Sequence, residues 1–192
     1  MPMSISGEGL DLLMEYRAFP ISEVAASRYE ELLADYKPRT IIDVGSGLGT
    51  SVLSACIVAV SGIAPIEHVY SIEISEMKRN WMRQYLGYCE MSEFVTSICQ
   101  DKFADVFTNV SRGPLLIFMD CWPEPAFEYA NIITHTYSTV DTTVVIDCST
   151  VQDQSTEELL LRLLGGQRQL GSSALGDLLV TTLPKIRCIE SS

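Results

Sequence analysis

Basic residues are scarce in this chain. Its 192 residues include 13 Lys and Arg against 25 Asp and Glu, which gives a formal net charge of −12. Proteins that bind nucleic acid need a basic surface to displace counterions from the phosphates, so nucleic acid is not expected as a partner. The apolar content is ordinary for a globular protein, and the length favours one domain spanning residues 1–192.

The sequence also lacks a long apolar run and a secretory leader. The longest uncharged stretch, residues 52–66, is interrupted by Gly62 and Pro65 and is shorter than the roughly 20 residues that span a bilayer. We therefore expect a buried helix there and no membrane partner. The N-terminus has neither a basic start nor an apolar stretch, which indicates a cytoplasmic protein.

Motifs for zinc are absent as well. The six cysteines are scattered without a CxxC pair, and the chain has two histidines, so no zinc site is expected. The apolar surroundings of most cysteines are typical of free, reduced thiols. His135 falls in the middle of a predicted helix and His68 at the start of a predicted strand, so neither is expected to act in a site.

Short apolar runs alternate with helix-like stretches through most of the chain. The pattern predicts strands at 40–45, 68–75, 94–101, 114–120 and 142–149, and helices at 21–36, 50–61, 76–89, 126–140 and 156–166. Such alternation is typical of a parallel sheet with helices on both faces. Two further runs, 178–184 and 186–189, have no helix between them, which predicts antiparallel strands. The expected fold is α/β, a doubly wound, mostly parallel sheet of about seven strands, with residues 1–38 as a helical lid.

A loop of three glycines follows the first predicted strand. Gly45, Gly47 and Gly49 precede a predicted helix, at the edge where doubly wound sheets bind ligands. Glycine lets a ligand approach the backbone closely. The dinucleotide fingerprint GxGxxG needs a further Gly where this chain has Thr50. Asp43 lies two residues before Gly45, and its carboxylate suits a ligand with ammonium and sulfonium charges but would repel a pyrophosphate.

Two more acids end the next two predicted strands. Glu73 ends the second strand between two isoleucines, and Asp101 ends the third. An acid at the position of Glu73 can accept both hydroxyls of a ribose, which nucleoside cofactors require. The three strand-end acids together are more specific than any one of them, and they indicate a nucleoside-binding edge.

The glycine loop and its acids resemble motif I and its surroundings in the class I S-adenosylmethionine-dependent methyltransferases, which have a Rossmann-like fold. The resemblance implies S-adenosylmethionine as cofactor and S-adenosylhomocysteine as product. It also places Asp101 beside the adenine amino group. The cofactor site that it implies consists of Asp43, Gly45, Ser46, Gly47, Gly49, Thr50, Ser51, Glu73, Ile74, Asp101, Lys102, Asp120 and Trp122.

The stretches around Asp120 and Asp147, and the run 174–185, are similar to small-molecule O-methyltransferases of the catechol and caffeoyl-CoA type. Those enzymes hold a divalent cation with two Asp and one Asn. Here Cys148 stands in place of the Asn, and hard cations prefer oxygen ligands, so we expect no metal. The lysine that follows the first Asp in those enzymes is also missing.

Methyl transfer to oxygen needs a base that removes the acceptor proton. Asp120 is the first candidate, followed by Asp147, Glu124 and Tyr129. Two functions stay open on this sequence. One is a methyltransferase acting on a small-molecule, oxygen-bearing acceptor, and the other is a non-catalytic S-adenosylmethionine- or nucleoside-binding module that serves as a regulatory or partner subunit. An NAD-dependent oxidoreductase ranks third because of Thr50, and a homodimer is a further expectation.

Overall fold

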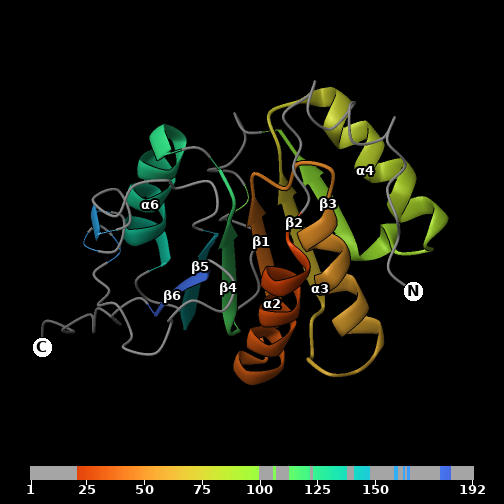
Figure 1. The fold of residues 1–192 in the computed structure, drawn as a ribbon, viewed down its shortest axis with the longest axis horizontal. Coiled ribbons are helices and arrows are strands. Elements are labelled where there is room, and N and C mark those ends of the chain that lie inside the picture. The colour runs from red at the N-terminus through yellow and green to blue at the C-terminus, as the bar shows by residue number, and fades with distance from the viewer. Residues whose placement is uncertain are drawn as a thin grey trace, which may run out of the picture.

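Six strands form one sheet in the part of the chain that the computed structural model describes, which is residues 21–99, 106, 113–121, 123–137, 141–147, 158, 159, 162, 164 and 178–182. Their order is β3-β2-β1-β4-β5-β6, and Figure 1 shows them side by side from β6 to β3. The strands are β1 Thr40–Val44, β2 His68–Ile72, β3 Val95–Ile98, β4 Leu115–Met119, β5 Thr142–Asp147 and β6 Leu178–Thr182.

The first five strands are parallel, and β6 runs antiparallel to β5. The expected α/β parallel sheet is therefore present. All residues of β1, β4 and β5 are buried, as is usual for strands covered by helices on both faces. The chain order reverses between β1 and β4, which makes the carboxyl ends of these two strands the switch point where ligands bind in such sheets. The expected strand at 186–189 lies outside the described residues.

In the described part of the chain, four α-helices and one short 3-10 helix flank the strands. They are α2 Glu23–Tyr36, α3 Thr50–Val60, α4 Glu76–Tyr88, η1 Ser92–Phe94 and α6 Pro123–Tyr137. Ser22 is the N-cap of α2, because the backbone N–H of Ala25 donates to Ser22 Oγ at 3.1 Å. The helix ends at Lys37, which is left-handed and donates its N–H to the Leu33 carbonyl oxygen, and the following Pro38 cannot continue the helical hydrogen bonds. The helix predicted at 156–166 is described at only a few positions.

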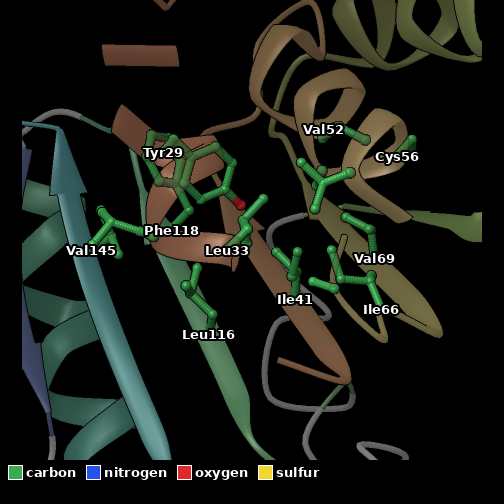
Figure 2. Close-up of a cluster of buried hydrophobic side chains, with 14 of the residues drawn as sticks. Tyr29, Leu33, Ile41, Val52, Cys56, Ile66, Val69, Leu116, Phe118 and Val145 are labelled. Atoms are coloured by element: carbon green, nitrogen blue, oxygen red, sulfur yellow. The ribbon is translucent and has the colours of Figure 1, made fainter. Parts of the chain in front are cut away.

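Side chains of successive strand residues point to opposite faces of the sheet, which divides the core into two clusters. On one face, Ile42, Ile117 and Val144 pack with α6 through Tyr129 and Ile133. On the other face lie α2, α3 and α4, whose buried residues include Tyr29, Leu33, Val52, Cys56, Met82 and Leu86. Figure 2 shows the Tyr29 ring against the Phe118 ring of β4, with centroids 4.5 Å apart. Helices therefore cover both faces.

Residues 21–38, the described part of the expected lid, are α2 and its caps. Tyr29 and Leu33 of this helix are fully buried against the sheet. The start of α2 is joined to the start of α3, since the backbone N–H of Ile21 donates to Thr50 Oγ1 at 3.1 Å. This segment is thus a core helix that begins at the rim of the glycine loop.

The expectation that residues 52–66 form a buried helix is only half right. Val52, Ala55, Cys56 and Val58 of α3 are buried, but Ile57 and Val60 point outward and are 41% and 55% exposed. The apolar run has no charged residue to reveal which side faces solvent, so the pattern could not predict an exposed side. None of the helices in the described part of the chain has the length and apolar character that a bilayer span needs.

Candidate functional site

Gly45 lets the backbones of β1 and β4 approach at the switch point. Its φ is 83° and its N–H donates to the carbonyl oxygen of Ile72 at 2.9 Å. A Cβ atom at this position would lie 2.0 Å from the carbonyl oxygen of Asp120. No other residue fits such a distance, so Gly45 is required by the close approach and by the positive φ together.

Gly49 ends the loop as the N-cap of α3, with φ 87°. A Cβ atom there would lie 2.4 Å from Met82 Cγ, so the side chain of α4 supports the loop from below. Ser46 also belongs to this support. Its side chain is 5% exposed and shares a hydrogen bond of 2.6 Å with Ser71 Oγ, which in turn donates to Met82 Sδ at 3.2 Å. The hydroxyl of Ser46 is therefore directed into the protein.

Glu73 lies directly after β2 with its carboxylate held by two backbone groups. The N–H of Gly47 donates to Oε2 at 2.9 Å, and the N–H of Ser75 donates to Oε1 at 2.8 Å. The residue is 6% exposed. A carboxylate has about four acceptor positions, so each oxygen can accept one more hydrogen bond. The loop and the carboxylate thus fix each other in position at the ligand edge.

Arg79 of α4 holds the backbone at Glu73 and Ile74 in place. The sequence pattern did not predict this role. Its guanidinium donates to the backbone carbonyls of Glu73 at 2.6 Å and Ile74 at 3.1 Å. A cation near the start of a helix interacts unfavourably with the helix dipole. The position of Arg79 near the start of α4 was therefore the feature of the sequence that could have pointed to a role for this residue. Next to it, the Ile74 side chain is 69% exposed, which leaves an apolar surface beside Glu73.

Asp43 is completely buried beneath the loop. In the described part of the chain neither of its carboxylate oxygens has a hydrogen-bond partner of good geometry. Burial raises the pKa of Asp43 to about 7; the nearby Ser51 hydroxyl lowers it, and the charges of Asp120 and Glu73 raise it further. A cation bound at this edge would offset part of that electrostatic cost.

A row of acidic residues crosses the carboxyl edge of the sheet. Val44 is in register with Ile72 and Met119, and Met119 with Ile146. One residue further along, Glu73, Gly45, Asp120 and Asp147 occupy neighbouring positions on strands about 4.8 Å apart. Asp120 is half-buried, whereas Asp147 is 2% exposed. The two predicted acids after the fourth and fifth strands therefore lie at the same edge as Glu73.

Tyr129 of α6 packs in the core on the opposite face and is 4% exposed. Its pKa is raised well above the ordinary value, first by burial and then by the charges of Cys121, Glu128, Glu73 and Cys99. A phenol with this pKa stays protonated near neutral pH. Tyr129 is consequently a poor general base, which argues against it as a candidate.

The remaining predicted residues divide into three groups. Thr50 and Ser51 open α3, where Thr50 Oγ1 accepts from Ile21 and Ser51 lies near Asp43. Asp101, Lys102 and Trp122, together with Cys148 and the side chain of Glu124, lie outside the described residues. Of the two histidines, His135 Nδ1 is hydrogen-bonded to the Asn131 carbonyl oxygen and His68 Nε2 to Thr96 Oγ1. No three His, Cys, Asp or Glu side chains of the described residues gather as a metal would require.

This geometry can be compared with solved structures. An O-methyltransferase from Bacillus cereus in complex with SAH has a TM-score of 0.67 and 14% identity, covering 95% of this chain and 92% of the other. The O-methyltransferase TomG of tomaymycin synthesis from Streptomyces achromogenes, in complex with SAM, has a TM-score of 0.66 and 13% identity over 96% and 91%. This chain has the O-methyltransferase fold.

A SAM-dependent O-methyltransferase from Thermotoga maritima extends the comparison, with a TM-score of 0.62 and 16% identity over 93% of this chain and 72% of the other. No protein-family model matches the chain, and no curated protein is significantly similar to it in sequence. At these identities the likeness concerns the O-methyltransferase fold itself, while the chemistry must be argued from the residues of this chain.

The close approach at Gly45 predicts a large loss of stability on substitution. We expect Gly45→Ala to lower the free energy of unfolding much more than Gly62→Ala, which should cost about 1 kcal/mol for its positive φ alone. Gly62 is a matched control because its φ is 69° and a Cβ atom there meets nothing within 4 Å. Urea unfolding of both variants checks this, and equal losses would contradict the role given to the Asp120 carbonyl.

The buried carboxyl of Asp43 predicts a pH dependence of stability. Because its pKa is about 7 in the fold against 3.8 ordinarily, the folded chain keeps a proton that the unfolded chain releases between these values. The stabilisation is complete below the ordinary pKa and is lost as the pH rises toward 7, by about 1.4 kcal/mol per pH unit.

Asp43→Asn should remove this slope, and the exposed Asp35→Asn should not. Urea unfolding between pH 5 and 8 measures both variants against the unchanged chain. If Asp43→Asn keeps the slope of the unchanged chain, another group titrates in its place.

Proposed function

We propose that this protein is an S-adenosylmethionine-dependent methyltransferase that acts on a small-molecule acceptor through an oxygen atom. The observation that carries the proposal is the Glu73 carboxylate, which the N–H groups of Gly47 and Ser75 hold at the end of β2, beside the switch point. A fixed acceptor pair beside a glycine loop suits the two hydroxyls of a ribose. The O-methyltransferase fold and the solved neighbours bound to SAM and SAH support the same reading.

The residues present fit this cofactor. Glu73 would accept the ribose hydroxyls, and the exposed Ile74 would contact the adenine ring. Gly47, where a Cβ atom would meet only the Gly45 carbonyl oxygen at 3.8 Å, leaves room for a ligand to approach the backbone. Asp43 is buried beneath the loop with no hydrogen-bond partner of good geometry among the described residues. A cation bound beside it would favour its charged form, which would then face the cationic end of the cofactor. The bound cofactor would supply an electrophilic methyl group on a sulfonium.

Asp120 is the proposed base. It lies one strand from Gly45 at the carboxyl edge and is half-buried, so an acceptor can reach it from outside. Its carboxylate would take the proton of the acceptor hydroxyl as the oxygen attacks. Asp147 is almost completely buried and is better suited to orient its neighbours, and Tyr129 stays protonated.

The donor set does not fit the divalent cation of the caffeoyl-CoA type enzymes. Asp120 and Asp147 would supply two carboxylates, but the residue after Asp147 is Cys148, whose thiol is a poor ligand for hard cations. The base mechanism proposed for Asp120 therefore includes no metal-dependent step.

Glu73→Ala tests the cofactor site by calorimetric titration with S-adenosylmethionine, S-adenosylhomocysteine and NAD. We expect the first two to bind and NAD not to bind, and the substitution to weaken binding about 100-fold because two charge-assisted hydrogen bonds are lost. Glu93→Ala, an exposed residue before β3, is the matched control. Binding of NAD alone, or equal affinities in the two variants, would overturn the assignment.

Asp120→Asn tests turnover separately from binding. With an acceptor found by screening phenols and other hydroxyl compounds, we expect the rate of methyl transfer to fall by about 100- to 10,000-fold, as for loss of a general base, while affinity for S-adenosylmethionine stays similar. An unchanged rate would refute the role of Asp120. Tight cofactor binding without turnover on any acceptor would favour the binding-module alternative.

A further inference from the structure

The outward side of α3 is an apolar strip without charge. Leu53, Ile57 and Val60 follow one another at steps of four and three residues, and Ile63 continues the strip beyond the helix. The last three are 41%, 55% and 53% exposed. In a coiled coil, the apolar residues through which two helices pack are also spaced by four and three residues. Gathered apolar side chains on a surface mark an interaction site.

The helices on either side of this strip carry opposite charges. In α2 the acidic residues outnumber the basic ones, and in α4 the basic residues outnumber the acidic ones, although the whole chain has a net charge of −12. The acids of α2 are Glu23, Glu30, Glu31 and Asp35 against Arg28, and the bases of α4 are Lys78, Arg79 and Arg83 against Glu76. An acidic helix, a neutral apolar helix and a basic helix thus follow one another.

All three helices cover the same face of the sheet. Their buried residues belong to one core cluster, with α2 over β4, α3 beside β1 and β2, and α4 continuing toward β3. Figure 1 shows α3 between α2 and α4. Their exposed sides therefore point away from the sheet in the same general direction and form one surface, which we define as the α2–α3–α4 face.

We propose that the α2–α3–α4 face binds a second copy of this chain about a two-fold axis parallel to α3. Such an axis sets α3 against α3 of the partner and places the acidic α2 of each copy over the basic α4 of the other. An axis perpendicular to α3 would set like charges together. The face is therefore self-complementary in one orientation, with an apolar centre and a charged rim.

The charged residues of α2 and α4 also lie at similar distances from the carboxyl edge of the sheet. α3 and α4 both begin at the carboxyl edge of the sheet, and the bond from Ile21 to Thr50 Oγ1 places the start of α2 there too. Glu31 and Arg83 then lie near the middle of their helices, level with Ile57. Both are exposed, and Tyr88, 87% exposed, adds an aromatic side chain to the rim of α4.

Sedimentation equilibrium of the full chain tests the proposal. We expect a dimer. We expect Ile57→Asp to raise the dissociation constant of this dimer by at least about 100-fold, because each dimer holds the substitution twice at its centre. Val60→Asp should act in the same way if the first variant folds poorly, as judged by circular dichroism. Leu159→Asp is the matched control, since Leu159 is 48% exposed near Leu164, which is buried in the cluster of the opposite face.

A charge exchange tests the orientation. Glu31→Arg and Arg83→Glu should each weaken the dimer several-fold at low salt, and the double variant should restore it. A chain that stays monomeric at 100 µM (roughly the level at which weak dimers still form) would overturn the proposal and leave the strip to another occupant. The proposal would also be overturned if neither Ile57→Asp nor Leu159→Asp changed the affinity of the dimer. It would likewise be overturned if the double charge variant dimerised more weakly than each single variant.

Discussion

The carboxyl edge of the sheet depends on the contact between two backbones. Gly45 at the end of β1 and Asp120 at the end of β4 approach so closely that a single Cβ atom would meet the Asp120 carbonyl at 2.0 Å. This contact closes the switch point, sends the glycine loop toward Glu73 and starts α3 at Gly49. The loop holds the Glu73 carboxylate through the N–H of Gly47, and the N–H groups of Gly45 and Ser46 also fix its path by donating to the Ile72 carbonyl oxygen.

The second property of the edge is its concentration of negative charge. Asp43, Glu73, Asp120 and Asp147 all lie at or near the carboxyl ends of the parallel strands, and Asp43 is buried with a pKa of about 7. Such an arrangement costs stability in the absence of a cation. A ligand that brings positive charge would offset this cost, and this is the physical link between the acidic edge and the proposed cofactor.

The acidic composition of the whole chain conceals an uneven distribution. Bases gather on α4 and acids on α2, with the uncharged α3 between them. Two copies with this overall charge repel at long range, so association requires local complementarity of the kind that the α2–α3–α4 face offers. The ligand edge and this face share α3, whose first turn belongs to the glycine loop.

The sequence alone determined the order of the elements. The runs around Ile41, Leu116 and Val145 were predicted as buried strands and the stretch 21–36 as a helix, because these signals depend on local pattern and backbone chemistry. The row formed by Glu73, Gly45, Asp120 and Asp147 was foreseen only as strand ends; strand register decided that they lie together. Tertiary packing alone decided that Ser46 points inward, that Arg79 braces the Glu73 corner and that Ile57 is exposed. Each of these depends on neighbours distant in the sequence, and an apolar helix without charges does not reveal which of its sides meets water.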